Sequence, residues 1–150
     1  MIESFWGIIY KMKDNEPYFL VLKRQAMSKK IEWTAPKWKA KDNENPIDAA
    51  KREIYEETNL NPDLLVNKGK LGDFIISFPD NSFEKKVTYY LFEYKWDEQD
   101  VKLTDSEWYL WIYNWLPIDN VINLIPYKGL RELYRKAYFT INKNLKSLSN

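Results

Sequence analysis

Short runs of apolar and aromatic residues alternate with polar, turn-forming segments along the first third of the chain. Residues 2–12 and 17–24 are the first two runs, and the turn-like residues 13–16 separate them. Both runs are rich in the β-branched and aromatic residues that favour strands. A polar connection over residues 25–30 leads to a shorter run at residues 31–34. This pattern predicts an opening pair of strands and then a third, short strand.

A helix is predicted after the loop that follows the third strand and ends near Asn45. Asparagine is a preferred N-cap residue, Pro46 suits the first helical position, and Asp48 places negative charge in the first turn. Asn59, a residue that tolerates the left-handed conformation, is expected to end the helix ahead of Pro62. The predicted buried stripe consists of side chains at helical spacing, with an aromatic ring at its edge: Ile47, Ala50, Ile54 and Tyr55.

The middle of the chain returns to strand-like runs. Residues 71–78 and 87–96 predict two strands, and the turn-forming residues 79–82 join them. Residues 97–107 are acidic and loop-like. The aromatic-rich run at residues 108–115 predicts one further strand.

Helical spacing dominates the last part of the chain. Residues 118–125 predict a short helix, and a polar tail follows Leu145. Apolar residues three and four positions apart predict a longer helix between them: Leu130, Leu133, Tyr134, Ala137 and Tyr138. Strands with one inserted helix, followed by further helices, predict an α/β (α+β) fold with a mixed sheet covered on both faces.

Composition narrows the chemistry. The 150 residues are expected to form one domain, and an aromatic content of 17% is high enough that some rings can serve a ligand. A formal net charge of +1 provides no global field for nucleic acid or anionic lipid, so any phosphate binding must be local. The chain has no Cys and no His, which excludes disulfides, thiolate catalysis and histidine bases. Carboxylate, Lys and Tyr side chains are left for acid–base chemistry.

The N-terminus has no signal-peptide pattern, and no run reaches the roughly 18 apolar residues of a membrane span. We therefore expect a cytoplasmic protein with no membrane contact, and we take it to be a monomer.

Three carboxylates mark the predicted helix. Glu53, Glu56 and Glu57 stand at i, i+3 and i+4 and share one face, where their like charges repel. They also lie in the C-terminal half, where the helix dipole disfavours negative charge. A hard divalent cation would neutralise them, because such ions prefer carboxylate oxygens. A solvated acidic face balanced by Lys51 and Arg52 is an equally good interpretation of the three glutamates alone.

The segment from Trp33 to Leu60 resembles the signature of the Nudix hydrolases. That signature is a glycine, five residues, a glutamate, seven residues, and then Arg-Glu-apolar-any-Glu-Glu-any-Gly-apolar. Here Glu44 is followed by seven residues and by Arg-Glu-Ile-Tyr-Glu-Glu-Thr-Asn-Leu at residues 52–60, so every charged position is filled. The resemblance implies a Nudix-type α/β/α sandwich, formed by a single Nudix hydrolase domain over residues 1–150.

Both glycines of the signature are replaced. Asn59 stands for the second one, where it suits a left-handed residue. Trp38 stands for the first one, in a loop whose backbone carbonyl usually helps to bind metal in this family. A bulky aromatic residue with positive φ would be an outlier. We therefore expect either a rebuilt loop or one whose conformation never needed glycine.

Nearly the whole chain is similar to the asymmetrical diadenosine tetraphosphate hydrolases within that family. The Trp-x-x-Pro-Lys entry is matched by residues 33–37, and the Lys-x-Val-x-Tyr strand by residues 85–89. Ser106-Glu107 and Trp115-Leu116 resemble two further elements, while Trp108 replaces the family histidine.

This resemblance implies a substrate site. Lys37 and Lys85 would hold phosphates, and Tyr89 and Tyr127 would stack on bases. A solvated lysine and an amphipathic core tyrosine are the alternative interpretations of these residues taken singly. Trp38 is expected to bind substrate by stacking on a base, with a blocked site as its alternative.

The resemblance also implies the metal chemistry. Cations must neutralise the phosphate oxygens and lower the pKa of the attacking water. Glu53, Glu56 and Glu57 would bind Mg²⁺ or Mn²⁺, with Glu107 as a further ligand. Glu56 or Glu57 would also act as the base or orient the water, since no histidine is present. Arg52 and Glu44 are assigned support roles, because Arg52 can pair with Glu44 and Glu56.

Three functions follow in order of preference. The first is metal-dependent hydrolysis of a dinucleoside polyphosphate such as diadenosine tetraphosphate, a small nucleotide substrate. The second is pyrophosphate removal from RNA 5′ ends, which is less favoured because no extended basic patch is evident. The third is a degenerate Nudix domain that binds nucleotide as a sensor.

Overall fold

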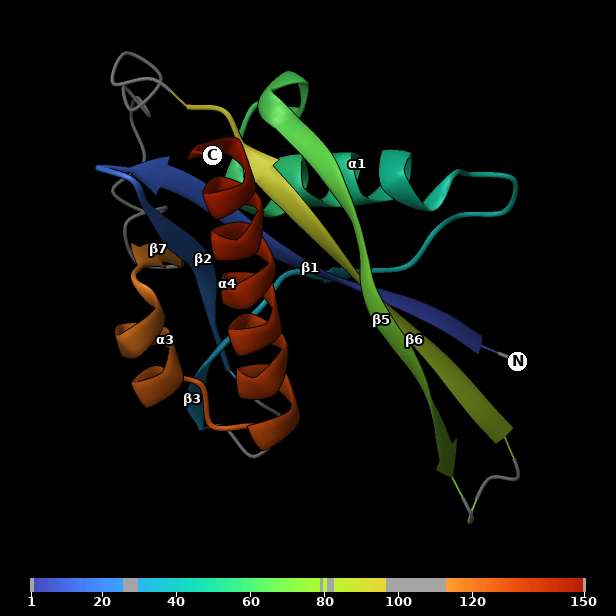
Figure 1. Ribbon diagram of the computed structural model, residues 1–150. Coiled ribbons are helices and arrows are strands. Elements are labelled where there is room, and N and C mark those ends of the chain that lie inside the picture. Colours follow the sequence, from blue (N-terminus) through green and yellow to red (C-terminus); the bar gives the residue numbers. More distant parts are fainter. Residues whose placement is uncertain (1, 26–29, 79, 81–82, 97–112, 150) are drawn as a thin grey trace.

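A seven-stranded mixed sheet forms the centre of the molecule in a computed structural model, which describes residues 2–25, 30–78, 80, 83–96 and 113–149 (Figure 1). The strands are β1 (Ile2–Lys13), β2 (Glu16–Gln25), β3 (Ile31–Thr34), β4 (Lys37–Trp38), β5 (Leu65–Phe78), β6 (Phe83–Tyr94) and β7 (Tyr113–Leu116). The main order is β3-β2-β1-β6-β5, while β4 pairs with β1 and β7 pairs with β2. Only β1 and β6 run parallel within this described sheet, so the sheet is mixed as predicted.

Helices cover both faces of the sheet (Figure 1). α1 (Pro46–Thr58) lies on one face, and α3 (Ile118–Leu124) and α4 (Lys128–Ser149) lie on the other. A short 3₁₀ helix, η1 (Pro62–Leu64), follows α1. The arrangement confirms the predicted α/β/α sandwich.

Each face of the sheet has its own hydrophobic core, because neighbouring strand residues point to opposite sides. On β1, Ile8 packs in the α3–α4 core and Ile9 packs in the α1 core, both with no exposed surface. Tyr134 of α4 is also fully buried, and its hydroxyl donates a hydrogen bond to the backbone oxygen of Leu20 at 3.0 Å. The two cores hold α1 and α4 at fixed positions against the sheet.

The predicted caps of α1 are present. The Asn45 side chain accepts a hydrogen bond from the Ile47 amide at 2.8 Å, and Pro46 is the first helical residue. Asn59 is left-handed with φ 61°, and its amide donates to the Tyr55 oxygen. Ala49, Ala50 and Ile54 are buried, whereas Tyr55 is half exposed.

Several boundaries differ from the sequence predictions. β5 begins at Leu65, six residues before the predicted start at residue 71. The prediction missed these residues because they include polar side chains, Gly69 with φ 112° and two register shifts, which disrupt the strand pattern in the sequence. β4 was predicted as loop, and α4 continues through the predicted polar tail to Ser149. The strand predicted at residues 108–115 begins at Tyr113 in the described part of the chain, which excludes residues 97–112.

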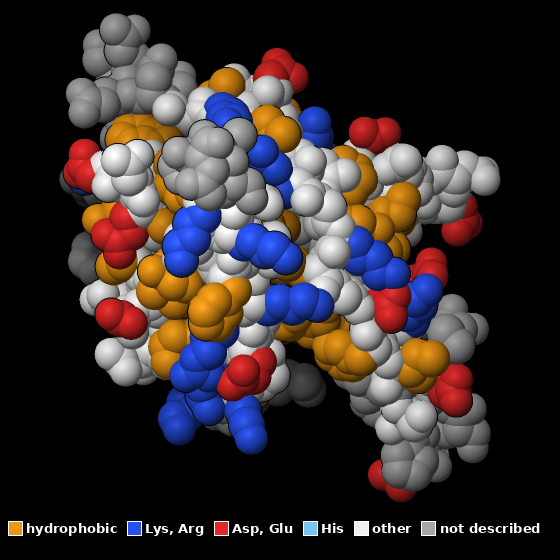
Figure 2. Space-filling view, in the orientation of Figure 1, with side chains coloured by type: hydrophobic (Ala, Val, Ile, Leu, Met, Phe, Trp, Pro, Cys, Tyr) orange, Lys and Arg blue, Asp and Glu red, His pale blue; other side chains and the backbone are white. Residues whose placement is uncertain are grey.

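The outer side of α4 carries basic side chains beside exposed hydrophobic ones (Figure 2). Phe139 is 70% exposed there, close to Lys136 and Lys143. None of the described helices is long and apolar enough to span a membrane.

Candidate active site

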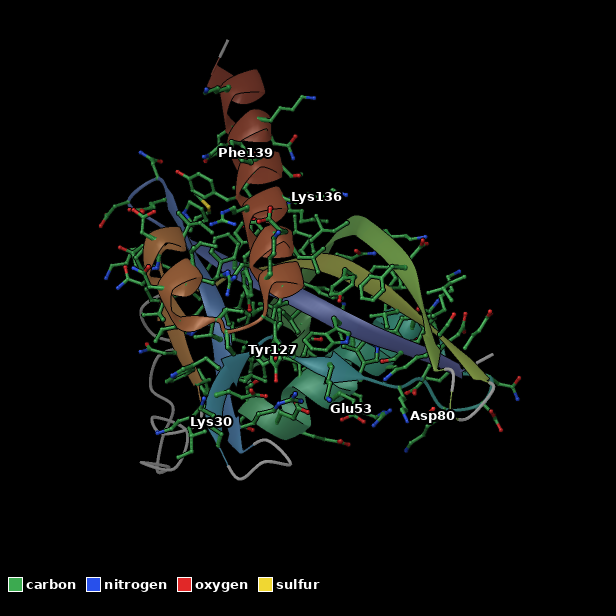
Figure 3. The ribbon with its side chains drawn as sticks, turned by 90° about the horizontal axis from the view of Figure 1, so that it is seen from below. Lys30, Glu53, Asp80, Tyr127, Lys136 and Phe139 are labelled. Atoms are coloured by element: carbon green, nitrogen blue, oxygen red, sulfur yellow. The ribbon has the colours of Figure 1, made fainter. Side chains whose placement is uncertain are left out.

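The acidic face of α1 is fixed by the burial of its opposite face against the sheet. Ala50 and Ile54 pack in the α1 core, which turns Glu53, Glu56 and Glu57 outward. Figure 3 shows Glu53 on this helix. The structure therefore brings the three predicted carboxylates to one side of α1.

Arg52 connects these carboxylates to the preceding loop. Its Nε and Nη2 atoms each donate to Glu44 at 3.0 Å, a bidentate contact, and Nη1 donates to Glu53 at 2.9 Å. The distance from Nη1 to Glu56 is 3.6 Å. The hydrogen bonds from Arg52 hold the pKa of Glu44 at about 2. The predicted pairing of Arg52 with Glu44 and Glu56 is confirmed, and Glu53 joins it.

Glu57 has a different environment from its two neighbours. Burial, and then the negative charges of Glu53 and Glu56, raise its pKa to about 7, although Lys37 opposes the shift. Without a cation, the negative charges of Glu53 and Glu56 therefore add to burial in disfavouring the ionised form of Glu57. A carboxylate of this kind favours a metal ion over a proton as pH rises.

A cavity of about 480 Å³ lies between the C-terminal half of α1 and the end of β2 and β3. We call it the α1 cavity, and its walls are Leu22, Lys23, Arg24, Thr34, Ala35, Lys37, Glu56 and Glu57. Burial lowers the pKa of Lys37, and the positive charges of Arg24 and Lys85 lower it further. The cavity thus has an acidic wall on α1 and a basic wall on the sheet.

A second cavity, of about 470 Å³, lies between the sheet and the start of α4. We call it the aromatic cavity, and its walls are Trp6, Phe74, Tyr89, Tyr127, Gly129, Leu130, Glu132, Leu133 and Lys136. The Tyr89 ring stacks on Phe74 at 5.4 Å between centroids and lies 5.9 Å from the Trp6 ring. The two tyrosines predicted to hold bases therefore line one cavity. Sequence reasoning missed Trp6 and Phe74. The sheet register explains why both lie near Tyr89: Trp6 pairs with Tyr89 on one side, and Gly72, two residues before Phe74 on β5, pairs with it on the other.

The two cavities adjoin. Lys37 lines the α1 cavity, and its Nζ atom lies 5.8 Å from the centre of the Trp6 ring in the aromatic cavity. The Tyr127 hydroxyl donates to the Glu32 carboxylate at 2.7 Å and 2.8 Å, and Figure 3 shows Tyr127 beside β3 at the start of α4. Glu32 also pairs with Arg24 at 3.4 Å. Sequence reasoning missed this link because its members are far apart in the chain.

Trp38 is part of the core, which corrects the expectation that it stacks on a base. Its side chain is 4% exposed, it stacks on Phe5 at 5.9 Å, and its indole N–H donates to the Pro46 oxygen at 3.0 Å. The indole fills the space beside Gly7, where an added Cβ would lie 3.0 Å from the ring. Trp38 is not among the described residues with positive φ, so this loop never needed glycine. A ring enclosed in this way offers no face to a base.

Two expectations remain separate from these cavities. Lys85 is half-buried on β6 and lines neither of the two cavities, although its charge affects Lys37. Glu107, the expected further metal ligand, and Trp108 lie outside the described residues.

The fit of the acidic face to a divalent metal rests on its donor chemistry. Glu53, Glu56 and Glu57 provide the oxygen ligands that Mg²⁺ and Mn²⁺ prefer. Across the described residues, no three acidic side chains are gathered in a metal-binding arrangement, and Glu53 and Glu56 are directed toward Arg52 instead. To bind an ion together with Glu57, the Glu53 and Glu56 side chains would adopt rotamers that turn their carboxylates away from Arg52.

Comparison with known protein families shows to which family this chain belongs. The NUDIX domain model matches residues 3–138, which is most of the chain. The chain belongs to the Nudix family. As a Nudix hydrolase it acts on the pyrophosphate bonds of nucleoside diphosphate derivatives, a class that generally uses divalent metal ions. None of the curated proteins searched matches this Nudix chain.

Solved structures with the same fold differ in the nucleotide or pterin compound that they act on or are solved with. An Ap4A hydrolase from C. elegans is 24% identical, with a TM-score of 0.67 over 91% of this chain and 95% of that one. The NUDIX domain of NrtR from Shewanella oneidensis, solved with ADP ribose, is 12% identical, with a TM-score of 0.64 over 91% and 86% of the two chains. The E. coli dihydroneopterin triphosphate pyrophosphohydrolase is 14% identical, with a TM-score of 0.64 over 92% and 95%. At these identities the structures share the fold, and the substrate must be argued from the site.

Proposed function

We propose that this Nudix hydrolase cleaves a dinucleoside polyphosphate, with diadenosine tetraphosphate as the representative substrate. The observation that carries the proposal is the proximity of a charged cavity and an aromatic cavity, with Lys37 of the first 5.8 Å from the ring of Trp6 of the second. A polyphosphate chain matches the basic wall near Lys37, and a base matches the rings of Tyr89 and Tyr127. The C. elegans structure that shares the fold is itself an Ap4A hydrolase, which agrees with this choice.

The residues have separate roles in the proposed reaction. Glu53, Glu56 and Glu57 would hold Mg²⁺ or Mn²⁺, which neutralises phosphate oxygens and acidifies the attacking water. Arg52 would position the carboxylates through the contacts it makes with Glu44 and Glu53. Glu56 or Glu57, the two carboxylates that line the α1 cavity, would take the proton from water or orient it, since the chain has no histidine to do so.

The test is hydrolysis of diadenosine tetraphosphate with Mg²⁺, followed by chromatography of the released nucleotides. We expect Glu56→Gln and Glu57→Gln each to lower kcat by about a hundredfold or more, the scale of a lost metal ligand or base. Glu16→Gln removes an exposed carboxylate on β2 and serves as the control with unchanged kcat.

Each other outcome has a defined meaning. Full activity in both α1 variants would contradict the assigned roles. Nucleotide binding that depends on Mg²⁺ without any turnover would instead favour a sensor. Release of pyrophosphate from 5′-triphosphorylated RNA, with diadenosine tetraphosphate left intact, would replace the proposed substrate.

A further inference from the structure

Two buried polar atoms in the α1 cavity lack hydrogen-bond partners within the part of the chain that the structure describes. They are the Nε atom of Arg24 and the hydroxyl oxygen of Thr34. Both residues line the cavity that contains Lys37, Glu56 and Glu57, and Thr34 is only 2% exposed. Unpartnered buried polar groups are rare in folded proteins, since each costs desolvation energy without a compensating contact.

The sheet fixes both groups on the same side. In the antiparallel ladder of β2 and β3, Leu22 is opposite Thr34 and Arg24 is opposite Glu32. Residues two apart on a strand point to the same face, so Arg24 and Thr34 both face the cavity next to Leu22. Their positions are therefore set by the strand register rather than by a flexible loop.

The charges on this wall are not balanced. Arg24 pairs with Glu32 at 3.4 Å, which is long for a charge-assisted contact. The Tyr127 hydroxyl lies closer to both carboxylate oxygens of Glu32, at 2.8 Å and 2.7 Å, and donates its one proton to them. Lys37 experiences the positive charge of Arg24 as repulsion, on top of its partial burial. An anion between Arg24 and Lys37 would relieve this repulsion, while a metal ion would occupy the opposite wall formed by Glu56 and Glu57.

We propose that Arg24 and Thr34 form a phosphate-binding subsite of this enzyme. The Arg24 Nε–H and the Thr34 hydroxyl each donate a hydrogen bond to oxygens of the substrate polyphosphate. The planar guanidinium presents several donors to a phosphate, and the hydroxyl adds one more at the rigid end of β3. The subsite rests on the proposed function in one respect, namely that the substrate carries a polyphosphate chain.

Glu32 gives this subsite a connection to the aromatic cavity. The same carboxylate contacts Arg24 and the Tyr127 hydroxyl, so one side chain positions a donor for phosphate and a ring for a base. A nucleotide with its base on Tyr127 would place its phosphates toward Arg24. The subsite thus favours a substrate that has both groups over a bare nucleoside.

Calorimetric titration of the full chain with inorganic tripolyphosphate, in excess Mg²⁺, tests the subsite without requiring turnover. We expect Arg24→Gln to weaken binding about tenfold or more, and Thr34→Val to weaken it about threefold or more, from the loss of hydrogen bonds to a charged group. Arg24→Lys should restore part of the affinity. Lys30→Gln removes an exposed positive charge from the same strand connection and should change the dissociation constant less than twofold.

Thermal unfolding distinguishes the unpartnered hydroxyl of Thr34 in the α1 cavity from the hydrogen-bonded hydroxyl of Thr58 in α1. Thr58 donates to the Ile54 oxygen at 2.6 Å and accepts from the Leu60 amide, so Thr58→Val should lower Tm. Thr34→Val removes an unpartnered hydroxyl of similar burial and should leave Tm unchanged or raise it. A fall in Tm as large as that of Thr58→Val would show that Thr34 has an internal partner and would overturn its role.

The two proposals fail in different ways. If wild type does not bind tripolyphosphate, or if Arg24→Gln binds it as wild type does, the subsite is wrong even when diadenosine tetraphosphate is hydrolysed. If tripolyphosphate binding depends on Arg24 while that substrate is left intact, the subsite stands and the proposed reaction is wrong.

Discussion

Glu57 is the residue at which protonation, metal binding and stability meet. Its ordinary pKa of 4.5 rises to about 7 in the folded chain, chiefly through burial and then through Glu53 and Glu56. The folded state therefore binds this proton more tightly than the unfolded chain does. The stabilisation from this group is fully present below pH about 4.5 and is lost as the pH rises through about 7.

We expect the metal-free protein to lose about 1–2 kcal/mol of unfolding free energy between pH 5 and pH 8 because of this group. The figure is reduced from the full linkage value because Glu57 is partly exposed to solvent. Urea unfolding in EDTA, compared with Glu57→Gln, measures it. The same loss in the variant would assign the pH dependence to other groups. Added Mg²⁺ should restore at pH 8 the unfolding free energy that the metal-free wild type loses, because the ion binds the folded state.

Residue spacing predicted one half of the site much better than the other. The contacts of Arg52 follow from positions within a single helix and its preceding loop, so the sequence was sufficient for Glu44 and Glu56. Arg24 and Glu32 become neighbours of Tyr127 only when β3 and the start of α4 are brought together. No local pattern encodes that contact, because its energy depends on the tertiary structure.

Trp38 shows the same limit at the scale of elements. The family signature places glycine at this position, which suggested a role for the indole in the site. The two-residue strand β4 instead turns Trp38 inward against β1, and Gly7 leaves room for its ring. Trp38, which stands on β4 where the signature has glycine, is thus accommodated by the small Gly7 on β1. The indole N–H also donates a hydrogen bond to the backbone oxygen of Pro46 in α1.

Replacement of Trp38 should therefore affect folding before it affects chemistry. We expect Trp38→Gly to lower the unfolding free energy by about 3–5 kcal/mol, the usual cost of deleting a large buried aromatic side chain. Trp38→Phe keeps most of the packing and should cost less, with loss of the indole hydrogen bond. Denaturant unfolding measures both. Wild-type stability in Trp38→Gly would show that the indole is not a core residue.

Element prediction succeeded where local signals agree and failed where they conflict. α1 has an N-cap, a proline at its first position and a left-handed Asn59, and each of these was recognisable in the sequence. The start of β5 has polar residues and a glycine at register shifts, so its strand character comes from pairing with β6 rather than from its own residues. Base-binding tyrosines were expected from resemblance, whereas their common cavity is a property of the packed α4.

At the scale of the whole molecule, the fold says little about the substrate. Structures with TM-scores of 0.64–0.67 to this chain include an Ap4A hydrolase and a domain that binds ADP ribose. The net charge of +1 is also uninformative, since the basic and acidic groups are sorted onto opposite walls of one cavity. Within this molecule, Lys37 of the α1 cavity lies near the Trp6 ring of the aromatic cavity, and Glu32 contacts both Arg24 and Tyr127, one residue from each cavity.

If a base and a polyphosphate bind across these two cavities, removing one ring should weaken nucleotides selectively. We expect Tyr127→Ala to raise KM for diadenosine tetraphosphate roughly tenfold to a hundredfold, the range for a lost base–aromatic stack, with little change in kcat. Binding of tripolyphosphate, which has no base, should be nearly unchanged. Steady-state kinetics and calorimetry on the same preparations measure the two effects.

Two variants separate the ring of Tyr127 from its hydroxyl and from general surface effects. Tyr127→Phe keeps the ring and loses the hydrogen bond to the Glu32 carboxylate, so its KM should stay closer to wild type than that of Tyr127→Ala. Phe139→Ala removes a ring that is 70% exposed on α4 outside the aromatic cavity, and it should behave as wild type. An equal rise in KM for Tyr127→Ala and Phe139→Ala would contradict base binding in this cavity. Since kcat reports the α1 carboxylates and KM the aromatic rings, a selective change in KM would show that the two cavities contribute separately to one substrate.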